Sequence, residues 1–353
     1  MAKGRTQLML AGDVGGTKTY LGLFVRDGDC LEAVREGAFG NSDFKDHMEI
    51  IGDFLDREVI GDIASASFGI ASPVFGGRCR LTNLHWVIDA GRIGKRFKIG
   101  RVELINDLVA TAWGMGYLHE DEFKVLQKGR PVAGNAALIA AGTGLGECML
   151  FWDGKAHIPS ASEGGHADFA PRSGLEIELL QYLIKTYGHV SYERVLSGQG
   201  LKNIYDFLTA RRNAPAPERL RKGFESGDAA SVVAQEAMRG NDKDCALALE
   251  LFASVYGGEA GNLALKCMAS AGLYVGGGIA PKMLKALEGG AFIRSFRDKG
   301  RFEGYLGRVP VKVILFDRTA LLGAAAHAAG HAAGSGKRIK EIRVGGRTPS
   351  RRR

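Results

Sequence analysis

The chain has 353 residues, enough for one large or two medium domains, and its 45% apolar and 24% charged residues are typical of a globular protein. Glycine accounts for 51 residues, about twice its usual share of roughly 7%, but only nine prolines and no Gly-x-y period accompany it, which excludes collagen and low-complexity disorder. The formal net charge of +8 lies almost wholly in residues 337–353, where eight Lys and Arg against one Glu give +7, so the nearly neutral remainder does not indicate a nucleic-acid-binding protein.

The N-terminal third of the chain predicts strands that are joined by turns and followed by helices. β-branched and aromatic residues bounded by turn formers indicate the strands, and apolar residues at helical spacing, such as Met48, Ile51 and Leu55, indicate the helices. The predicted strands cover 7–11, 17–25, 32–39, 65–70 and 102–105, and the predicted helices cover 44–59 and 108–118.

The next part of the chain begins with a copy of its N-terminal hairpin. The segment ALIAAGTGLGECMLFW repeats the strand, glycine turn and strand of LMLAGDVGGTKTYLGLF about 130 residues further along. Such a repeat predicts a duplicated domain with a ligand cleft between the two copies. The remainder predicts helices over 175–187, 191–196, 200–211, 229–239, 245–269 and 281–287, strands over 272–275 and 311–316, and a packed helix within 319–336.

The first glycine turn, Asp13-Val14-Gly15-Gly16-Thr17, is a candidate phosphate site. A strand that ends in Asp and turns through two glycines exposes consecutive backbone N–H groups, which form a concave anion site. Thr17 adds a hydroxyl donor and Lys18 a positive charge. A plain hairpin turn explains the paired glycines equally well, so this motif alone decides nothing.

Two further glycine runs favour a nucleotide. Gly142-Thr143-Gly144-x-Gly146 resembles a dinucleotide motif only loosely, because a strand rather than a helix follows it, and a Rossmann site is therefore disfavoured. Gly276-Gly277-Gly278 follows another buried strand. Three such turns in a duplicated α/β chain favour a nucleotide held between two domains, with both hairpins near its phosphates.

Asn106 and Asp107 stand between a predicted strand and a predicted helix. Either residue can cap that helix, as Asn and Asp often do. A carboxylate at the C-terminal end of a strand can also point toward a ligand, because α/β sheets bind ligands at this edge. Spacing alone favours the cap, and the two roles are compatible.

Glu163 and His166 lie on a predicted loop, because the two glycines between them prevent a regular helix. A metal site is not favoured here, because Asp168 is the one further candidate ligand nearby and a typical site needs more His or Cys ligands. The Glu163 carboxylate accepts hydrogen bonds and the His166 imidazole can donate and accept them, so the pair suits the recognition of a polyol better than the binding of a metal.

Together these motifs resemble the bacterial glucokinase family of the hexokinase–actin–heat-shock ATPase superfamily. The resemblance covers roughly residues 7–330 and rests, in the family's order, on AGDVGGTKTYLGLF, ASFGIASPVFGGRCRLTNLHW, LINDLVATAWG, AAGTGLGECML, SEGGHADFAPR, HVSYERVLSGQGL and YVGGGIAPK. It implies an α/β fold of duplicated ribonuclease H-like (actin-like ATPase) domains with a ligand cleft between them. The implied small domain covers 1–115 and about 316–336, the large domain 116–315, and a basic disordered tail 337–353.

The resemblance also implies roles for individual residues. Asp107 matches the catalytic base, and Asn106, Glu163, His166 and Glu193 match ligands of the sugar hydroxyls. Asp13 matches the partner of a magnesium ion, through water, and Lys18 stands where many members carry Asn. The positions that match ATP-binding residues are Gly12, Asp13, Val14, Gly15, Gly16, Thr17, Gly142, Thr143, Gly144, Gly276, Gly277 and Gly278.

The implied activity is phosphoryl transfer from Mg-ATP to the 6-hydroxyl of glucose, the first step of glycolysis, by a cytoplasmic homodimer without a membrane segment. The five cysteines are odd in number and form no C-x-x-C, which is typical of a reducing compartment and argues against disulfides or structural zinc. The basic tail has no counterpart in the family. Its three large aliphatic residues predict disorder, with at most loose contact to nucleic acid.

Other functions stay open at this stage. Another hexose kinase, acting on mannose, glucosamine or an N-acetylated sugar, fits nearly as well, and so does ADP or polyphosphate as the phosphoryl donor. A sugar-sensing repressor of the related ROK family fits less well, since only 12 residues precede Asp13 and a Cys-rich zinc motif is absent. An actin-like or heat-shock ATPase module is disfavoured, because such a protein would have no use for the candidate sugar ligands.

Overall fold

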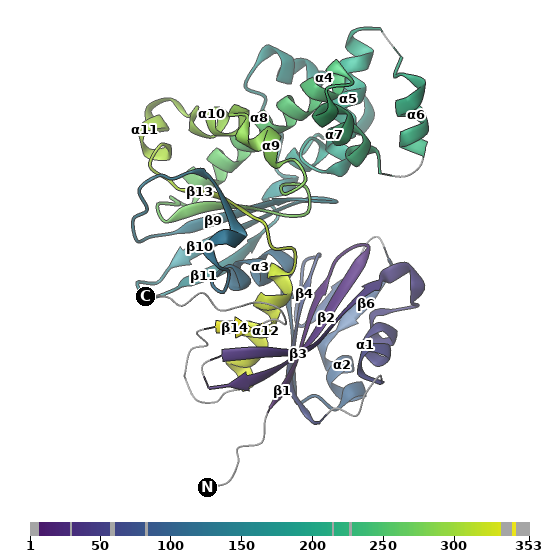
Figure 1. Cartoon of the computed structure of the whole chain (residues 1–353), viewed down its shortest axis with the longest axis vertical. Helices are drawn as coiled ribbons and strands as arrows, with labels where there is room; N and C mark the ends of the chain where they lie inside the picture. Colours follow the sequence, from purple (N-terminus) through teal and green to yellow (C-terminus); the bar gives the residue numbers. More distant parts are fainter. Residues whose placement is uncertain are drawn as a thin grey trace. The chain divides into compact units, whose positions relative to one another are not determined.

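The chain passes twice between two structural units (Figure 1). The computed structural model describes residues 7–28, 30–56, 61–81, 84–213, 215–225, 228–332 and 341–343. Unit 1 comprises the residues up to Glu122 and those from Phe316 onward, and unit 2 runs from Phe123 to Leu315. The first boundary lies after Glu122 rather than at 115/116, because the chain continues through a short 3-10 helix, Glu120–Glu122, before the first strand of unit 2 begins.

The sheet of unit 1 has the strand order β14-β3-β2-β1-β4-β7. Strands β1, β2 and β3 form an antiparallel meander, and β4 and β7 then continue the sheet parallel to β1. The bounds are β1 Leu8–Val14, β2 Lys18–Asp27, β3 Cys30–Gly40, β4 Ile63–Ile70, β7 Arg101–Asn106 and β14 Glu341–Arg343. The carboxyl ends of the parallel strands β1, β4 and β7 therefore meet at one edge, where the candidate residues lie.

Helices cover both faces of this sheet (Figure 1). The side chains of α1 and α2 pack with Leu10, Leu21 and Phe68 in one buried cluster, while the Ala-rich α12 packs on β1, β4 and α3. The bounds are α1 His47–Asp56, α2 Ala90–Phe97, α3 Asp107–Met115 and α12 Thr319–Ala332, with a small ribbon of β5 Arg78–Arg80 and β6 Val87–Asp89 and a 3-10 turn over Asn41–Asp43.

Unit 2 repeats this topology. Its sheet has the order β11-β10-β9-β12-β13-β8, in which β9, β10 and β11 form the antiparallel meander and β12 and β13 continue parallel to β9. The bounds are β8 Phe123–Gln127, β9 Ala136–Ala141, β10 Leu145–Trp152, β11 His157–Ser162, β12 Gly272–Gly276 and β13 Val311–Ile314. The repeated meander and parallel extension confirm the duplicated α/β fold that the glycine hairpins predicted.

A helical layer completes unit 2, and its centre is the long helix α8, Lys243–Lys266, most of whose side chains are buried. Helices α5, α7 and α10 pack on α8 and share one large apolar core with the sheet. The other bounds are α4 Gly174–Tyr187, α5 Gly198–Arg211, α6 Glu218–Glu225, α7 Ala229–Arg239, α9 Leu284–Glu288, α10 Ala291–Arg297 and α11 Glu303–Leu306, with 3-10 turns over Gly164–His166, Tyr192–Arg194 and Gly300–Phe302.

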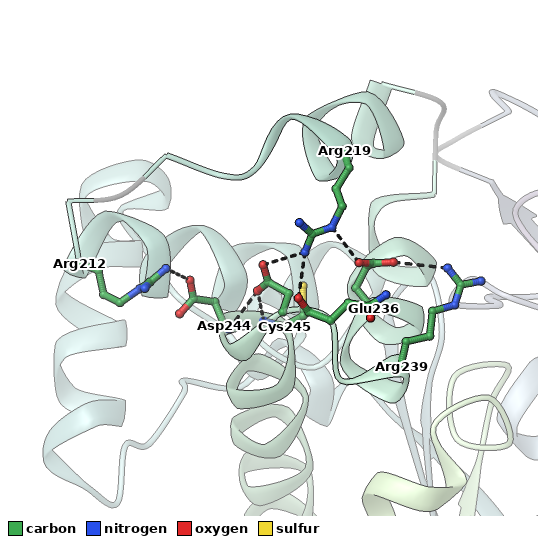
Figure 2. A network of polar contacts seen from close by, with 8 residues as sticks. Arg212, Arg219, Glu236, Arg239, Asp244 and Cys245 are labelled. Atoms are coloured by element: carbon green, nitrogen blue, oxygen red, sulfur yellow. Dashed lines mark hydrogen bonds and ion pairs between the residues drawn. The ribbon is translucent and has the colours of Figure 1, made fainter.

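Ion pairs tie the short helix α6 to α7 and α8 (Figure 2). The guanidinium of Arg219 lies 3.1 Å from the Glu236 carboxylate and 3.5 Å from that of Asp242, which caps α8. Arg239 reaches the second oxygen of Glu236, and Arg212 pairs with Asp244. Arg219 lies on α6 and Glu236 on α7, so this network holds α6 in place. Apolar packing contributes less there, because Leu220 is the buried side chain of this short helix.

Two sequence predictions need correction. The helix predicted over 191–196 is a single 3-10 turn, Tyr192–Arg194, because the side chain of Ser197 caps α5 immediately afterwards. Within the tail predicted to be disordered, Glu341–Arg343 forms β14, which pairs with β3 and buries Ile342, so disorder is wrong for these three residues. The prediction of disorder counted only apolar residues, whereas the edge of β3 also offers backbone hydrogen bonds to this segment. The rest of 337–353 lies outside the described residues.

Within the described part of the chain, no helix combines the length and apolar character that a membrane span requires. The five cysteines all lie within that part and form no disulfide.

Candidate active site

The first glycine turn joins β1 to β2 and has the geometry of a phosphate-binding hairpin. The amide of Gly15 is used inside the turn, where it donates to the carbonyl of Lys18 at 3.0 Å. The amides of Gly16 and Thr17 donate to no acceptor among the described residues, and Thr17 and Lys18 are exposed. Two N–H groups and a hydroxyl are therefore available to an anion.

Asn41, which sequence reasoning did not select, fixes the shape of this turn. Its side chain is almost fully buried, donates from Nδ2 to the carbonyl of Gly15 at 2.9 Å, and accepts from Thr19 Oγ1 at 2.8 Å. Its amide also donates to the carbonyl of Thr17 at 3.0 Å. One buried side chain thus connects both ends of the turn to the end of β3.

Asn106 and Asp107 lie where β7 ends and α3 begins, and the structure separates their roles. Asn106 is the N-cap, because its Oδ1 accepts from the amides of Leu108 at 2.9 Å and Val109 at 3.3 Å. Asp107 is the first helical residue, and its Oδ1 also accepts from the amide of Leu108 at 2.9 Å. Asn106 accepts from both amides and Asp107 shares only that of Leu108, so the cap does not depend on Asp107.

Gly69 on β4 brings Asp13 and Asp107 together. In the sheet register Gly69 lies between Asp13 on β1 and Ile105 on β7. A Cβ atom at Gly69 would lie 2.8 Å from the Cβ of Ala110 and 3.6 Å from the Cα of Asp107, so any other residue would push α3 away from the strand. A lone glycine inside a strand pattern is the signal that could have found this position.

The electrostatics of Asp13 fit a cation partner. Burial and the negative charge of Asp107 raise the pKa of Asp13 to about 7. Two carboxyl groups whose negative charges interact are a fitting partner for a hard cation such as magnesium. Within the described residues, no group of three His, Cys, Asp or Glu side chains is arranged so that it could hold a metal ion.

The second glycine turn, Gly142–Gly144, joins β9 to β10 in unit 2 and contacts Glu193. Glu193 Oε2 accepts from the amide of Leu145 at 3.0 Å, and a Cβ atom on Gly144 would lie 2.3 Å from that oxygen. The amides of Thr143 and Gly144 donate to no acceptor among the described residues. The candidate sugar ligand Glu193 and the second phosphate hairpin therefore lie side by side.

The loop that carries Glu163 and His166 lies directly on β10. A Cβ atom on Gly165 would lie 2.0 Å from the carbonyl oxygen of Leu145, so this position requires glycine, and one on Gly164 would lie 2.0 Å from Glu147 Oε2, so a side chain there would displace that carboxyl group. The side chains of Glu163 and His166 are more than half exposed, and His166 Nε2 lies 3.9 Å from Glu163 Oε2. Both are thus available to a ligand.

The third glycine run, Gly276–Gly278, follows β12 and lies beside the second hairpin. The amide of Ile279 donates to the carbonyl of Ala141, the residue before Gly142, at 3.3 Å. Gly198, at the start of α5, donates to the carbonyl of Gly142 at 2.9 Å. Unit 2 therefore brings together Glu193, Gly142–Gly144 and Gly276–Gly278, while unit 1 brings together Asp13, Asn106 and Asp107.

The arrangement matches known proteins over nearly the whole chain. The model of the family described as Glucokinase matches residues 10–331. The glucokinase of Synechocystis sp. is 40% identical over 91% of this chain and 97% of its own length, and that of Pectobacterium atrosepticum is 34% identical over 91% and 97%. The chain belongs to the glucokinase family.

Solved structures agree with this family membership. The glucokinase of an Antarctic psychrotroph is 30% identical, with a TM-score of 0.79 over 92% of this chain and all of that chain. At 19% identity, a ROK family glucokinase from Streptomyces griseus shares the fold, with a TM-score of 0.62 over 92% of this chain and 99% of that chain. The family has the two-domain actin-like ATPase fold, as the family resemblance implied.

Proposed function

We propose that this protein is a glucokinase that transfers the terminal phosphoryl group of Mg-ATP to the 6-hydroxyl of glucose. The observation that carries the proposal is the placement of Asp13, Asn106 and Asp107 at the carboxyl ends of the parallel strands β1 and β7, which flank β4, beside a phosphate-binding hairpin. The relatives with more than a third of their residues identical are named glucokinases, which supports glucose as the sugar.

Asp107 takes the proton of the sugar hydroxyl in this mechanism. A base within hydrogen-bond reach of the hydroxyl typically contributes about 10²–10⁴-fold to the rate. The hydrogen bond from the Leu108 amide fixes the orientation of the Asp107 carboxylate, and the capping bonds of Asn106 fix the start of α3. Asp107 is therefore held in place before the substrate arrives.

The sugar is recognised by groups that match its hydroxyls. Asn106, Glu163, His166 and Glu193 offer an amide, two carboxylates and an imidazole, and these accept from or donate to hydroxyl groups. A sugar that lacks one of these hydroxyls leaves a polar group without a partner, at a cost of about 1–3 kcal/mol. This asymmetry is the proposed source of sugar specificity.

The two glycine hairpins position the phosphates. The amides of Gly16, Thr17, Thr143 and Gly144 have no acceptor among the described residues, and Gly276–Gly278 lies beside the second hairpin. The Streptomyces griseus protein of the same fold was solved with glucose and AMPPNP, an ATP analogue, which supports ATP as the donor. Asp13 would hold magnesium through water, and the ion would supply positive charge to neutralise the phosphates.

We further propose a cytoplasmic location, supported by five cysteines without a disulfide. The family resemblance implies a homodimer, which stays a prediction.

A coupled assay with glucose, mannose, glucosamine and N-acetylglucosamine, each offered with ATP, ADP or polyphosphate, tests the function. We expect glucose with ATP to give the highest kcat/KM. Glu163→Gln and His166→Ala should raise the KM for glucose far more than that for ATP. A higher kcat/KM for another hexose would contradict glucose as the substrate.

A further inference from the structure

Two glutamates are buried together in unit 2, beneath the loops assigned to sugar binding. Glu147 on β10 is 1% exposed, and Glu259 on α8 is fully buried. Neither residue matches a sugar, phosphate or magnesium ligand of the proposed mechanism. Two carboxyl groups that share a buried site cannot both ionise readily, so one of them keeps its proton.

The surroundings show which glutamate carries the charge. Glu259 accepts from Asn262 Nδ2 at 2.8 Å and from Lys266 Nζ at 3.3 Å, and both contacts favour a carboxylate. Glu147 has no comparable support, because its Oε1 is buried with no hydrogen-bond partner within the described residues. Burial and the charge of Glu259 raise the pKa of Glu147 to about 8. Glu147 is therefore the neutral member of the pair at physiological pH.

The carboxyl group of Glu147 lies directly under the loop that carries Glu163 and His166. Its Oε2 occupies the space where a side chain of Gly164 would begin, only 2.0 Å from an ideal Cβ position. The amide of Gly164 donates to Ser162 Oγ at 3.0 Å, on the strand that pairs with Glu147. A charge on Glu147 would therefore develop against the backbone of this loop, in a site closed to water.

Glu259 supports the segment that carries Glu193. Asn262, which donates to Glu259, also donates to the hydroxyl of Tyr192 at 3.1 Å. Tyr192 precedes Glu193 in its 3-10 turn, and its amide donates to the carbonyl of Ala167, next to His166, at 3.0 Å. The same buried network thus contacts both segments that hold the candidate sugar ligands of unit 2.

We propose that the neutral carboxyl group of Glu147, sharing its proton with Glu259, is a positioning device for Glu163, His166 and Glu193, and that loss of this proton weakens glucose binding. The inference rests on the proposed function of these three residues. The charged or titratable groups that face the pair are Lys266, Tyr256 and Cys267 on and after α8, Tyr192 on the opposite turn, and Lys299 after α10, which also donates to Asn262. Burial contributes most to the raised pKa of Glu147 and the charge of Glu259 adds to it, whereas Lys266 opposes both.

Glucose binding measured by calorimetry between pH 6.5 and 9 tests the proposal, with wild type, Glu147→Gln and Glu236→Gln. If only the protonated form is competent, the dissociation constant of the wild type rises about tenfold at pH 9, because about a tenth of the molecules keep the proton one unit above a pKa of about 8. Glu147→Gln keeps the shape and cannot ionise, so its affinity should not follow this rise. Glu236→Gln removes a buried carboxylate of the network in Figure 2 and should retain the wild-type profile.

The same pH dependence in wild type and Glu147→Gln would overturn the proposal. Amide hydrogen exchange of residues 163–168, corrected for the intrinsic rate at each pH, gives a second readout that needs no sugar. Protection should fall above pH 8 in the wild type and hold in Glu147→Gln, and equal protection in both proteins would also overturn it. A wild type that transfers no phosphoryl group to any sugar would refute the proposed function, while the exchange measurement would still decide the role of Glu147.

Discussion

Asn106 and Asp107 show how adjacent residues of similar chemistry divide two tasks. The sequence alone favours a cap for this pair, because Asn and Asp both commonly begin helices. In the structure Asn106 accepts from two helix amides, whereas Asp107 shares only the Leu108 amide and lies close enough to Asp13 for their charges to interact. The proposed catalytic role of Asp107 rests on this second contact, because interacting carboxylates are typical of functional sites.

Replacing Asp107 with Asn tests this separation. Asp107→Asn keeps the shape and one acceptor but cannot take a proton, so kcat should fall about 10²–10⁴-fold while the dissociation constant of glucose changes little. Asp89→Ala is the matched control, because Asp89 caps α2 through the Arg92 amide. It should lower the free energy of unfolding by about 1 kcal/mol and leave kcat unchanged. An Asp107→Asn enzyme with most of its turnover would reduce Asp107 to a structural residue.

His47 illustrates a buried polar group without a partner. It is 5% exposed, and neither ring nitrogen makes a hydrogen bond within the described residues. Burial lowers the pKa of His47 to about 4. Between about pH 6.5 and pH 4 the imidazole is therefore protonated in the unfolded chain but neutral in the folded protein. Stability contributed by the neutral imidazole is therefore lost as the pH falls from about 6.5 toward 4.

We expect His47→Leu to stabilise the protein, and more strongly at pH 5 than at pH 8. The substitution removes an unsatisfied polar group, worth about 1–3 kcal/mol, and also the proton uptake of the unfolded chain. Urea unfolding of both proteins at the two pH values measures the difference. An equal gain at both values would show that His47 does not couple to pH.

At the scale of elements, the sequence predicted the repeated strands and most of the helices, because each has its own periodicity or turn chemistry. It missed α2, α6 and α10, which are short and lie between strong signals, and β8 and β11, which are edge strands with exposed residues. The same limit applies to the site. Motifs located the glycine hairpins and the candidate ligands, whereas Asn41, Glu147 and Glu259 matter through contacts that only the folded chain creates.

The packing of α12 on α3 depends on glycine. A Cβ atom on Gly323 would lie 1.7 Å from the carbonyl oxygen of Ala110, so the two helix backbones are in contact there. A Cβ atom on Gly330, about two turns further along the same helix, would have nothing within 4 Å. Gly323→Ala should therefore lower the free energy of unfolding by at least about 1–3 kcal/mol, through overpacking.

Gly330→Ala is the matched control, because the same substitution on the same helix meets no atom. It should raise the free energy of unfolding by up to about 1 kcal/mol, since alanine favours the helix. Because α3 begins with Asp107, Gly323→Ala should also reduce kcat, whereas Gly330→Ala should not. Equal stability of the two variants in denaturant unfolding would contradict the backbone contact.

At the scale of the whole molecule, nearly all the net charge lies outside the part of the chain that forms the repeated α/β topology. The two α/β units account for the family match over residues 10–331, while nearly all the net charge lies after it. Strand β14 belongs to neither the matched region nor the repeated topology, since β11, the counterpart of β3, ends its own sheet. Strand β14 therefore lies parallel to β3 at an edge of the sheet of unit 1 and outside the region that the family model matches.

Removing residues 337–353 tests what this strand does. Truncation deletes β14, exposes the edge of β3 and removes Ile342, which is 2% exposed. An open strand edge pairs readily with other chains, so we expect the truncated protein to self-associate in a concentration-dependent way and to lose about 1–3 kcal/mol of stability, roughly the value of burying one isoleucine. Ile342→Ser in the full chain should reproduce the loss of stability, whereas Arg351→Ala should have no effect. Kinetic constants for glucose should stay unchanged, because no candidate site residue lies on β3 or β14. A truncated protein that melts like the wild type and stays equally dispersed in light scattering would show that β14 contributes nothing to the sheet.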